Sequence, residues 1–194
     1  MINFDLESLF FVLFILLLLS AFFSGAETSL MSVNRYKLKH KHKLGDNSAS
    51  KVNFLVTNPE KTLGLILLLN NFVNILASAI STLIAIKIYG EAGVAISVVV
   101  LTIIILIFAE VTPKTFAALY ADKIAYPVSL LLYPLMKIFY PIVILINFIS
   151  RIILRIFGIK TEKINQELLT KDEIKLIVKE SSHRIPKNHE DMIV

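Results

Sequence analysis

The sequence contains no cysteine among its 194 residues, and only 18% of the residues are charged. Without cysteine there is no disulfide framework, no cysteine-ligated zinc site and no cysteine nucleophile. The low charged fraction accompanies 56% hydrophobic residues and a mean hydropathy of +0.73. A soluble globule of this size cannot hide so much apolar side chain, because a large share of its residues faces water. Intrinsic disorder is excluded for the same reason, which leaves an integral membrane protein with a polar segment attached.

Three nearly uncharged runs are long enough to cross a bilayer. They extend from Leu9 to Val33, from Leu63 to Ile86 and from Ala92 to Ala109, and Glu27 is the one charge within them. Each has about the length that a helix needs to span a ~30 Å hydrocarbon core. The flank before the first run is acidic rather than basic, so the run is not typical of a cleaved signal peptide. We therefore predict three transmembrane helices.

A fourth apolar stretch, Tyr126 to Phe157, repeats Tyr-Pro every seven residues, at Tyr126, Tyr133 and Tyr140. Each proline removes a backbone donor and clashes with the carbonyl one turn back. Tyrosine is typical of the boundary between water and headgroups. We predict a kinked helical segment that lies along the membrane interface. A fourth transmembrane helix is the alternative, which hydropathy alone favours.

Basic residues gather in the link between the first two runs. Cytoplasmic loops carry an excess of such residues, so this link is predicted to be cytoplasmic. Three spans then place the N-terminus outside and the C-terminus in the cytoplasm, whereas a fourth span would export Arg151 and Arg155. The cations flank membrane spans, so we expect anionic lipid headgroups, and not nucleic acid, as their partners. The residues are Arg35, Lys37, Lys39, Lys41, Lys43, Lys51 and Lys61.

Beyond Thr161 the sequence becomes polar. Thr170 followed by Glu173 fits a capping box at a helix start, and a second start lies at Asn188. We expect a small cytoplasmic helical hairpin that is cut short at Val194. The expected architecture is an all-α integral membrane protein: a transmembrane domain over residues 1–158, and the start of a cytosolic helical bundle over residues 159–194.

Polar side chains within the spans indicate the function, because such groups are costly at membrane depth and usually face the protein interior. They offer hydroxyl, amide and carboxylate oxygens, which suit Mg²⁺, Ca²⁺ or Na⁺ rather than zinc or copper. Pro113 would also leave the carbonyl of Ala109 without a partner, beside the carboxylate of Glu110. The candidates are Ser20, Ser24, Gly25, Glu27 and Thr28 in the first run, Asn70, Asn71 and Asn74 in the second, and Glu110 with Pro113 in the third.

Each candidate also has a purely structural interpretation. Serine and threonine often bond to the carbonyl one turn back, and asparagine often joins helices in a membrane. Glu110 could pair with Lys114 at headgroup level. Glu27 could pair with Arg35 or Lys37 near the inner surface.

Three stretches resemble, in order, the signatures of the CorC/CNNM family of magnesium transport proteins. They are FFSGAET from Phe22, LNNFVN from Leu69 and FAEVTPKT from Phe108. The resemblance covers the three spans and the interfacial segment. It continues into Leu168 to Val194, which is similar to the start of the family's cytosolic bundle.

The resemblance implies a homodimer with three transmembrane helices and a belt-like juxtamembrane helix per subunit. It further implies ATP-binding CBS domains after the bundle, which this sequence does not contain. A dehydrated Mg²⁺ would lie in an inward-open cavity, held by Ser24, Asn70 and Glu110 with main-chain carbonyls nearby. The family often has glycine where this chain has Leu69 and Ala109, and these departures bear on carbonyl access and cation preference.

The function expected from these features is a Mg²⁺ transporter that exports by alternating access, with Na⁺ as a plausible coupling ion. The alternative is a membrane-embedded cation sensor or a regulator of other transporters. We do not expect an enzyme, because the spans contain neither a Ser/His or Cys/His pair nor an aspartate dyad.

Overall fold

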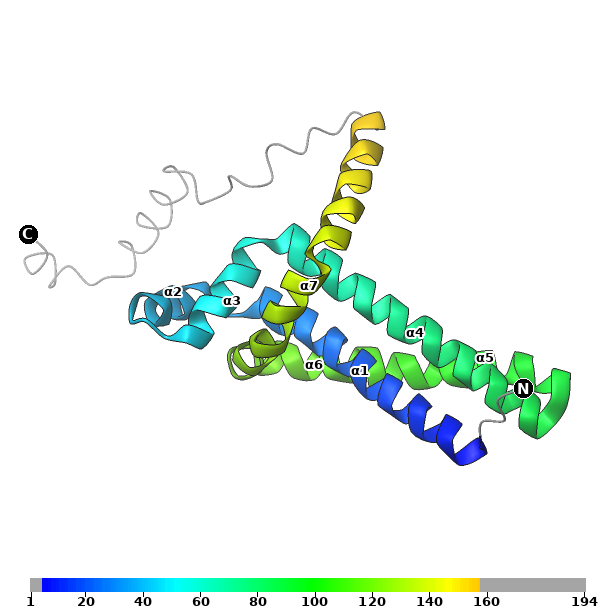
Figure 1. Ribbon diagram of the computed structural model, residues 1–194. Helices are drawn as coiled ribbons and strands as arrows, with labels where there is room; N and C mark the ends of the chain where they lie inside the picture. Colours follow the sequence, from blue (N-terminus) through cyan, green and yellow to red (C-terminus); the bar gives the residue numbers. More distant parts are fainter. Residues whose placement is uncertain (1–4, 158–194) are drawn as a thin grey trace, which may run out of the picture. The chain divides into compact units, whose positions relative to one another are not determined.

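The computed structural model describes residues 5–157, which are helical and contain no strand (Figure 1). The predicted cytosolic hairpin over residues 159–194 lies outside the described residues. The chain divides into two compact units after Asn147, and the contacts described below lie within the first unit. The elements are α1 (Leu6–Ser32), α2 (Arg35–Lys43), α3 (Asn47–Thr57), α4 (Pro59–Tyr89), the 3₁₀ turn η1 (Gly90–Ala92), α5 (Gly93–Ile104), the π-helix η2 (Ile105–Val111), α6 (Thr112–Leu119) and α7 (Ala121–Ile156).

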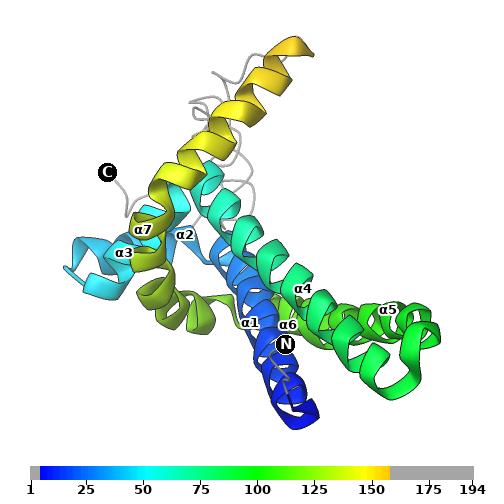
Figure 2. The same ribbon diagram turned by 45° about the vertical axis from the view of Figure 1, so that its right-hand side comes forward.

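Three helical segments are long and apolar enough to cross a membrane: Leu6–Ser32, Pro59–Leu119 and Ala121–Ile156. The second covers 61 residues and reverses direction at Gly90, so that α5 returns alongside α4 (Figures 1 and 2). This second segment thus contains two of the three predicted transmembrane runs, Leu63 to Ile86 and Ala92 to Ala109. The reversal depends on two glycines. Gly90 has a φ of +65°, and a Cβ on Gly93 would lie 2.7 Å from the carbonyl oxygen of Ala85.

Helix α1 packs against α4 on one side and against η2 and α6 on the other (Figure 2). At the second contact, Gly25 faces Pro113, and a Cβ on Gly25 would lie at an ordinary contact distance, 3.6 Å, from the carbonyl oxygen of Pro113. On α4, Ala77 is fully buried and belongs to the main core. Small residues therefore let α1 meet its neighbours closely around the polar residues described below.

The basic link predicted as a cytoplasmic loop is a helical hairpin, α2 and α3. Asn34 caps α2 by accepting from the N–H groups of Tyr36 and Lys37, and Asp46 caps α3 in the same way. Gly45 makes the turn between them with a φ of +82°. Asn34 and Asp46 are residue types that often cap helices, but the many lysines around them made the link look like a loop in the sequence.

Residues 121–147 of α7 pack a stripe of buried side chains against the core, including Ala125, Leu132 and Met136. The helix runs without interruption through all three prolines. Each proline lies on the exposed face, so the carbonyl left without a partner one turn back is accessible to polar surroundings. The predicted helix is present, and its placement relative to a membrane is considered below.

Candidate functional site

Two polar contacts connect the middle of α1 to α4. The hydroxyl of Ser20, which is fully buried, lies 3.0 Å from Oδ1 of Asn70 and 2.7 Å from Oδ1 of Asn74. A hydroxyl carries one proton, so it can donate fully to only one of these oxygens at a time. Three oxygen atoms therefore converge at one buried point. Ser20 lies four residues before Ser24 on the same helix face. This spacing indicated that Ser20 belongs to the polar cluster, although the ligand set expected from the sequence did not include it.

One turn further along α1, Ser24 faces the third polar element. Its hydroxyl is buried and donates to the main-chain carbonyl of Glu110 over 3.4 Å. Thr28 in turn donates to the carbonyl of Ser24, also over 3.4 Å. For Thr28 the structure thus shows the back-bonding that its structural interpretation anticipated. Ser24 makes a contact between helices.

Glu110 lies in the π-helix η2, where the backbone turn is wider than in an α-helix. The N–H of Thr112 bonds to the carbonyl of Ile107, five residues back, and Pro113 follows immediately. The sequence predicted that Pro113 would leave the carbonyl of Ala109 without a partner, and in the structure the turn that precedes the proline is a π-helix. Such π-turns within α-helices occur frequently at functional sites. Nothing in the sequence except Pro113 signalled this one.

The carboxylate of Glu110 is half-buried and forms no ion pair with any residue in the range 5–157. Lys114, the partner considered from the sequence, instead lies 3.5 Å from Oε2 of Glu27. The two suggested partners of Glu27 are engaged elsewhere: Lys37 pairs with Asp122 and Arg35 donates to the carbonyl of Val56. Both alternative pairings are therefore wrong, and the Glu110 carboxylate has no cationic side chain as a partner within residues 5–157.

The remaining candidates divide into two groups. Ala109 is fully buried beside Glu110, and the side chain of Leu69 packs against the core, so either could contribute only a main-chain oxygen. Asn71 is not brought to the cluster, because it is exposed and lines an apolar hollow of about 370 Å³ that also includes Phe72 and Ile146. Neighbouring residues of a helix point about 100° apart around its axis, and the sequence alone did not decide which face Asn71 occupies.

Residues 5–157 contain no group of three or more His, Cys, Asp or Glu side chains that could hold a metal. A cation at this site would therefore be held by hydroxyl, amide and main-chain oxygens with the single carboxylate of Glu110. Hard cations accept such a donor set. The oxygen donors that are present thus suit a hard cation such as Mg²⁺, Ca²⁺ or Na⁺.

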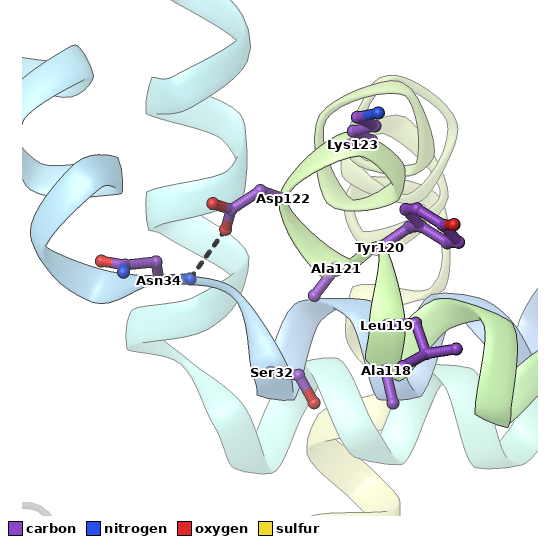
Figure 3. Close-up of a pocket in the computed structure, with 8 residues that line it drawn as sticks. All are labelled: Ser32, Asn34, Ala118, Leu119, Tyr120, Ala121, Asp122 and Lys123. Atoms are coloured by element: carbon purple, nitrogen blue, oxygen red, sulfur yellow. Dashed lines mark hydrogen bonds between the residues drawn. The ribbon is translucent and has the colours of Figure 1, made fainter.

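A second polar feature joins the end of α1 to the corner between α6 and α7 (Figure 3). Oδ1 of Asp122 accepts from the N–H of Asn34 over 3.0 Å, beside a pocket of about 310 Å³, and Oδ2 lies 3.2 Å from Nζ of Lys37. Asp122 precedes the apolar stretch that begins at Tyr126. The hydrogen bond from the N–H of Asn34 is the largest effect and lowers the pKa of this carboxyl; burial opposes it, and Lys37 and Lys41 lower the pKa further. The corner holds α6, and with it the π-helix, in place against α1.

Residues 11–190 match the CNNM family, described as the cyclin M transmembrane N-terminal domain. The chain is 48% identical to the UPF0053 inner membrane protein YfjD of Escherichia coli (strain K12), over 91% of this chain and 41% of that protein. It is 41% identical to a UPF0053 protein of Haemophilus influenzae, over 97% of this chain and 45% of that protein.

A further relative in Haemophilus influenzae, named polyamine export protein, is 28% identical over 84% of this chain and 40% of that protein. The chain therefore spans less than half the length of these curated relatives. It contains several helical segments apolar enough to cross a membrane and matches a transmembrane domain over most of its length. The chain is a multi-pass membrane protein of the CNNM family.

Proposed function

We propose that this chain is the transmembrane domain of a Mg²⁺ transporter, with the cation held between α1, α4 and η2. Ser24, Asn70 and Glu110 would provide the side-chain ligands, and the carbonyls of Leu69 and Ala109 would lie nearby. Export by alternating access is the direction we favour, with Na⁺ as the candidate coupling ion. Nucleotide regulation through CBS domains would belong to a longer protein.

The observation that carries this proposal is the charge of Glu110. An acidic side chain near the centre of a membrane helix costs roughly 2.5–3.5 kcal/mol on insertion scales. Lys114 would offset this cost if it paired with Glu110, but it pairs with Glu27. A bound cation would supply the missing positive charge.

The neighbouring oxygens are consistent with a hard cation. The side-chain oxygens of Asn70 and Asn74 lie within 3.0 Å of the Ser20 hydroxyl. One turn further along α1, the Ser24 hydroxyl donates to the main-chain carbonyl of Glu110 in the π-helix. Mg²⁺ typically binds one or two carboxylates and completes its octahedron with other oxygens. Leu69 and Ala109 would set how closely the backbone approaches the ion.

A second candidate cargo is a polyamine, which is favoured by the name of one relative. The same carboxylate and amide oxygens could accept hydrogen bonds from an ammonium group. A third candidate is a cation sensor that regulates other transporters through the same site. These alternatives differ in whether an ion crosses the membrane and which one does.

The membrane placement belongs to the same proposal. Lys41 of α2 lies over the ring of Tyr126, and Lys61, in the first turn of α4, lies over that of Tyr140. Both lysines are at the polar ends of their helices, which supports an interfacial position for α7 on the cytoplasmic side. The N-terminus would then be outside and the chain would assemble as a homodimer in the bilayer, without nucleic acid as a partner.

The test is ion flux by the purified chain in liposomes that contain a Mg²⁺-sensitive dye. A transporter should move Mg²⁺ down an imposed gradient, and Glu110→Gln should abolish the movement. A sensor should bind Mg²⁺ without flux. A polyamine carrier should instead move labelled spermidine, and Mg²⁺ should not compete for its site.

A further inference from the structure

A hollow between α3 and α7 is separate from the cation site. It encloses about 400 Å³ and is lined by His42, Ser50, Lys51, Asn53, Phe54 and Tyr133, among others. We call it the α3–α7 hollow. The rings of Phe54 and Tyr133 meet edge to face with 5.4 Å between their centroids, so an aromatic pair forms part of its wall and polar side chains form the rest.

The charge of the hollow is positive. Lys51 is half-buried and forms no ion pair with a carboxylate in residues 5–157. Lys137 lies 4.8 Å from the ring centroid of Tyr133 and so adds a second cation near this wall. The carboxylate of Asp46 is directed to the backbone N–H groups of Ser48 and Ala49 at the start of α3.

His42 connects α2 to α3 beside the hollow. Its Nδ1 lies 2.9 Å from the hydroxyl oxygen of Ser50, which lies 3.0 Å from the carbonyl oxygen of Asp46. Among the residues that line the hollow, Lys51 is the one lysine or arginine.

Exposed apolar side chains adjoin the hollow. They are Phe54, in its wall, and Leu130, about one turn before Tyr133 on α7. A ligand for this place would combine an anionic head, which fits the lysines, with a long apolar part, which fits the exposed face of α7. Free phosphate would satisfy only the first requirement.

We propose that the α3–α7 hollow binds the headgroup of an anionic phospholipid, with the phosphate at Lys51 and the acyl chains along α7. The site fixes the α2–α3 hairpin and α7 to the same leaflet. It depends on the interfacial position of α7 but not on which cation the chain transports.

The experiment measures lipid binding to the detergent-solubilised full chain by native mass spectrometry. Phosphatidylglycerol should be retained in preference to phosphatidylcholine. Lys51→Ala should weaken phosphatidylglycerol binding about fivefold, the effect of about one basic residue near a membrane surface. The matched control is Lys43→Ala, which removes the same charge from an exposed position in α2 that does not line the hollow; its affinity should stay within about twofold of the parent.

If Lys51→Ala and Lys43→Ala lose the same phosphatidylglycerol affinity, the lipid is held by diffuse attraction to a basic surface, and the proposed site is wrong. Inorganic phosphate and glycerol 1-phosphate should not displace the lipid at comparable concentrations; displacement would assign the hollow to a soluble phosphate instead. If Lys51→Ala does not fold, as judged by size-exclusion chromatography, Lys51→Gln takes its place. Glu110→Gln should bind phosphatidylglycerol like the parent, so failure of the cation site and failure of the lipid site can be told apart.

Discussion

Lys114 pairs with Glu27 across the contact between α1 and α6, at 3.5 Å, and not with Glu110, which lies four residues before it in sequence. Glu27 thus pairs with Lys114, which lies one turn after Glu110 and would otherwise be placed to neutralise the Glu110 carboxylate. The pair lies about one turn beyond Ser24 on α1. Its arrangement makes the charge of Glu110 available to a cation.

Glu110→Gln should abolish Mg²⁺ binding, because it removes the sole carboxylate of the site. Asn70→Ala and Ser24→Ala should weaken binding, since each removes one neutral oxygen. Isothermal titration with folded, dimeric protein measures the difference. Parent-like Mg²⁺ affinity in a folded Glu110→Gln protein would make Glu110 a structural residue and refute the site.

Glu27→Gln should weaken Mg²⁺ binding less than Glu110→Gln does, and by an indirect route. Without Glu27, Lys114 can turn towards Glu110, because side chains about one turn apart on a helix are neighbours. Adding Lys114→Gln to Glu27→Gln should therefore restore much of the affinity. A double variant that binds no better than Glu27→Gln would instead make Glu27 a direct ligand.

Ser20→Ala should lower both stability and Mg²⁺ affinity, because it removes the donor that faces Asn70 and Asn74. Loss of a buried hydrogen-bond partner costs about 1–3 kcal/mol. Thr28→Ala is the control, since its hydroxyl bonds only within its own helix. Thermal unfolding in detergent and Mg²⁺ titration of both variants provide the comparison, and equal effects would remove the role of Ser20.

Two glycine-to-alanine changes should differ in sign. At Gly25 a Cβ would meet its nearest neighbour at 3.6 Å, an ordinary contact, and alanine favours a helix over glycine by about 1 kcal/mol. At Gly93 it would lie 2.7 Å from the carbonyl of Ala85, and relieving the overlap should cost about 1–3 kcal/mol. We expect Gly25→Ala to keep or raise the unfolding temperature and Gly93→Ala to lower it. The opposite order would contradict the packing described here.

Asp122→Asn should destabilise the corner between α1 and α7 in a pH-dependent manner. The pKa of Asp122 is lowered in the folded chain, so its contribution to stability is present above the unfolded carboxyl pKa, about 4, and is lost as the pH falls through the folded value. The carboxylate is partly exposed and the ion pair is solvent-screened, so the effect at neutral pH should be under about 1 kcal/mol. Unfolding curves of both proteins should converge once the pH falls below the lowered, folded pKa of Asp122; a difference that persists in stronger acid would exclude the charge as its cause.

The sequence by itself determined that the chain belongs in a membrane, because its long uncharged runs leave no other way to bury so much apolar surface. It also indicated Ser24, Asn70 and Glu110, because polar groups stand out where polarity is costly. Their oxygen chemistry followed from residue type alone.

Only the tertiary structure decided which of several equivalent polar residues meet. Asn70 and Asn71 are adjacent in sequence, yet one faces Ser20 and the other an apolar hollow, because the rotation of α4 is set by its packing on α1. The pairing of Lys114 with Glu27 rather than Glu110 was equally undetermined, since both carboxylates lie within reach of a long, flexible side chain. The π-turn at Glu110 immediately precedes Pro113, which faces Gly25 of α1. Such arrangements depend on contacts between residues 50 to 86 positions apart, which local sequence patterns do not encode.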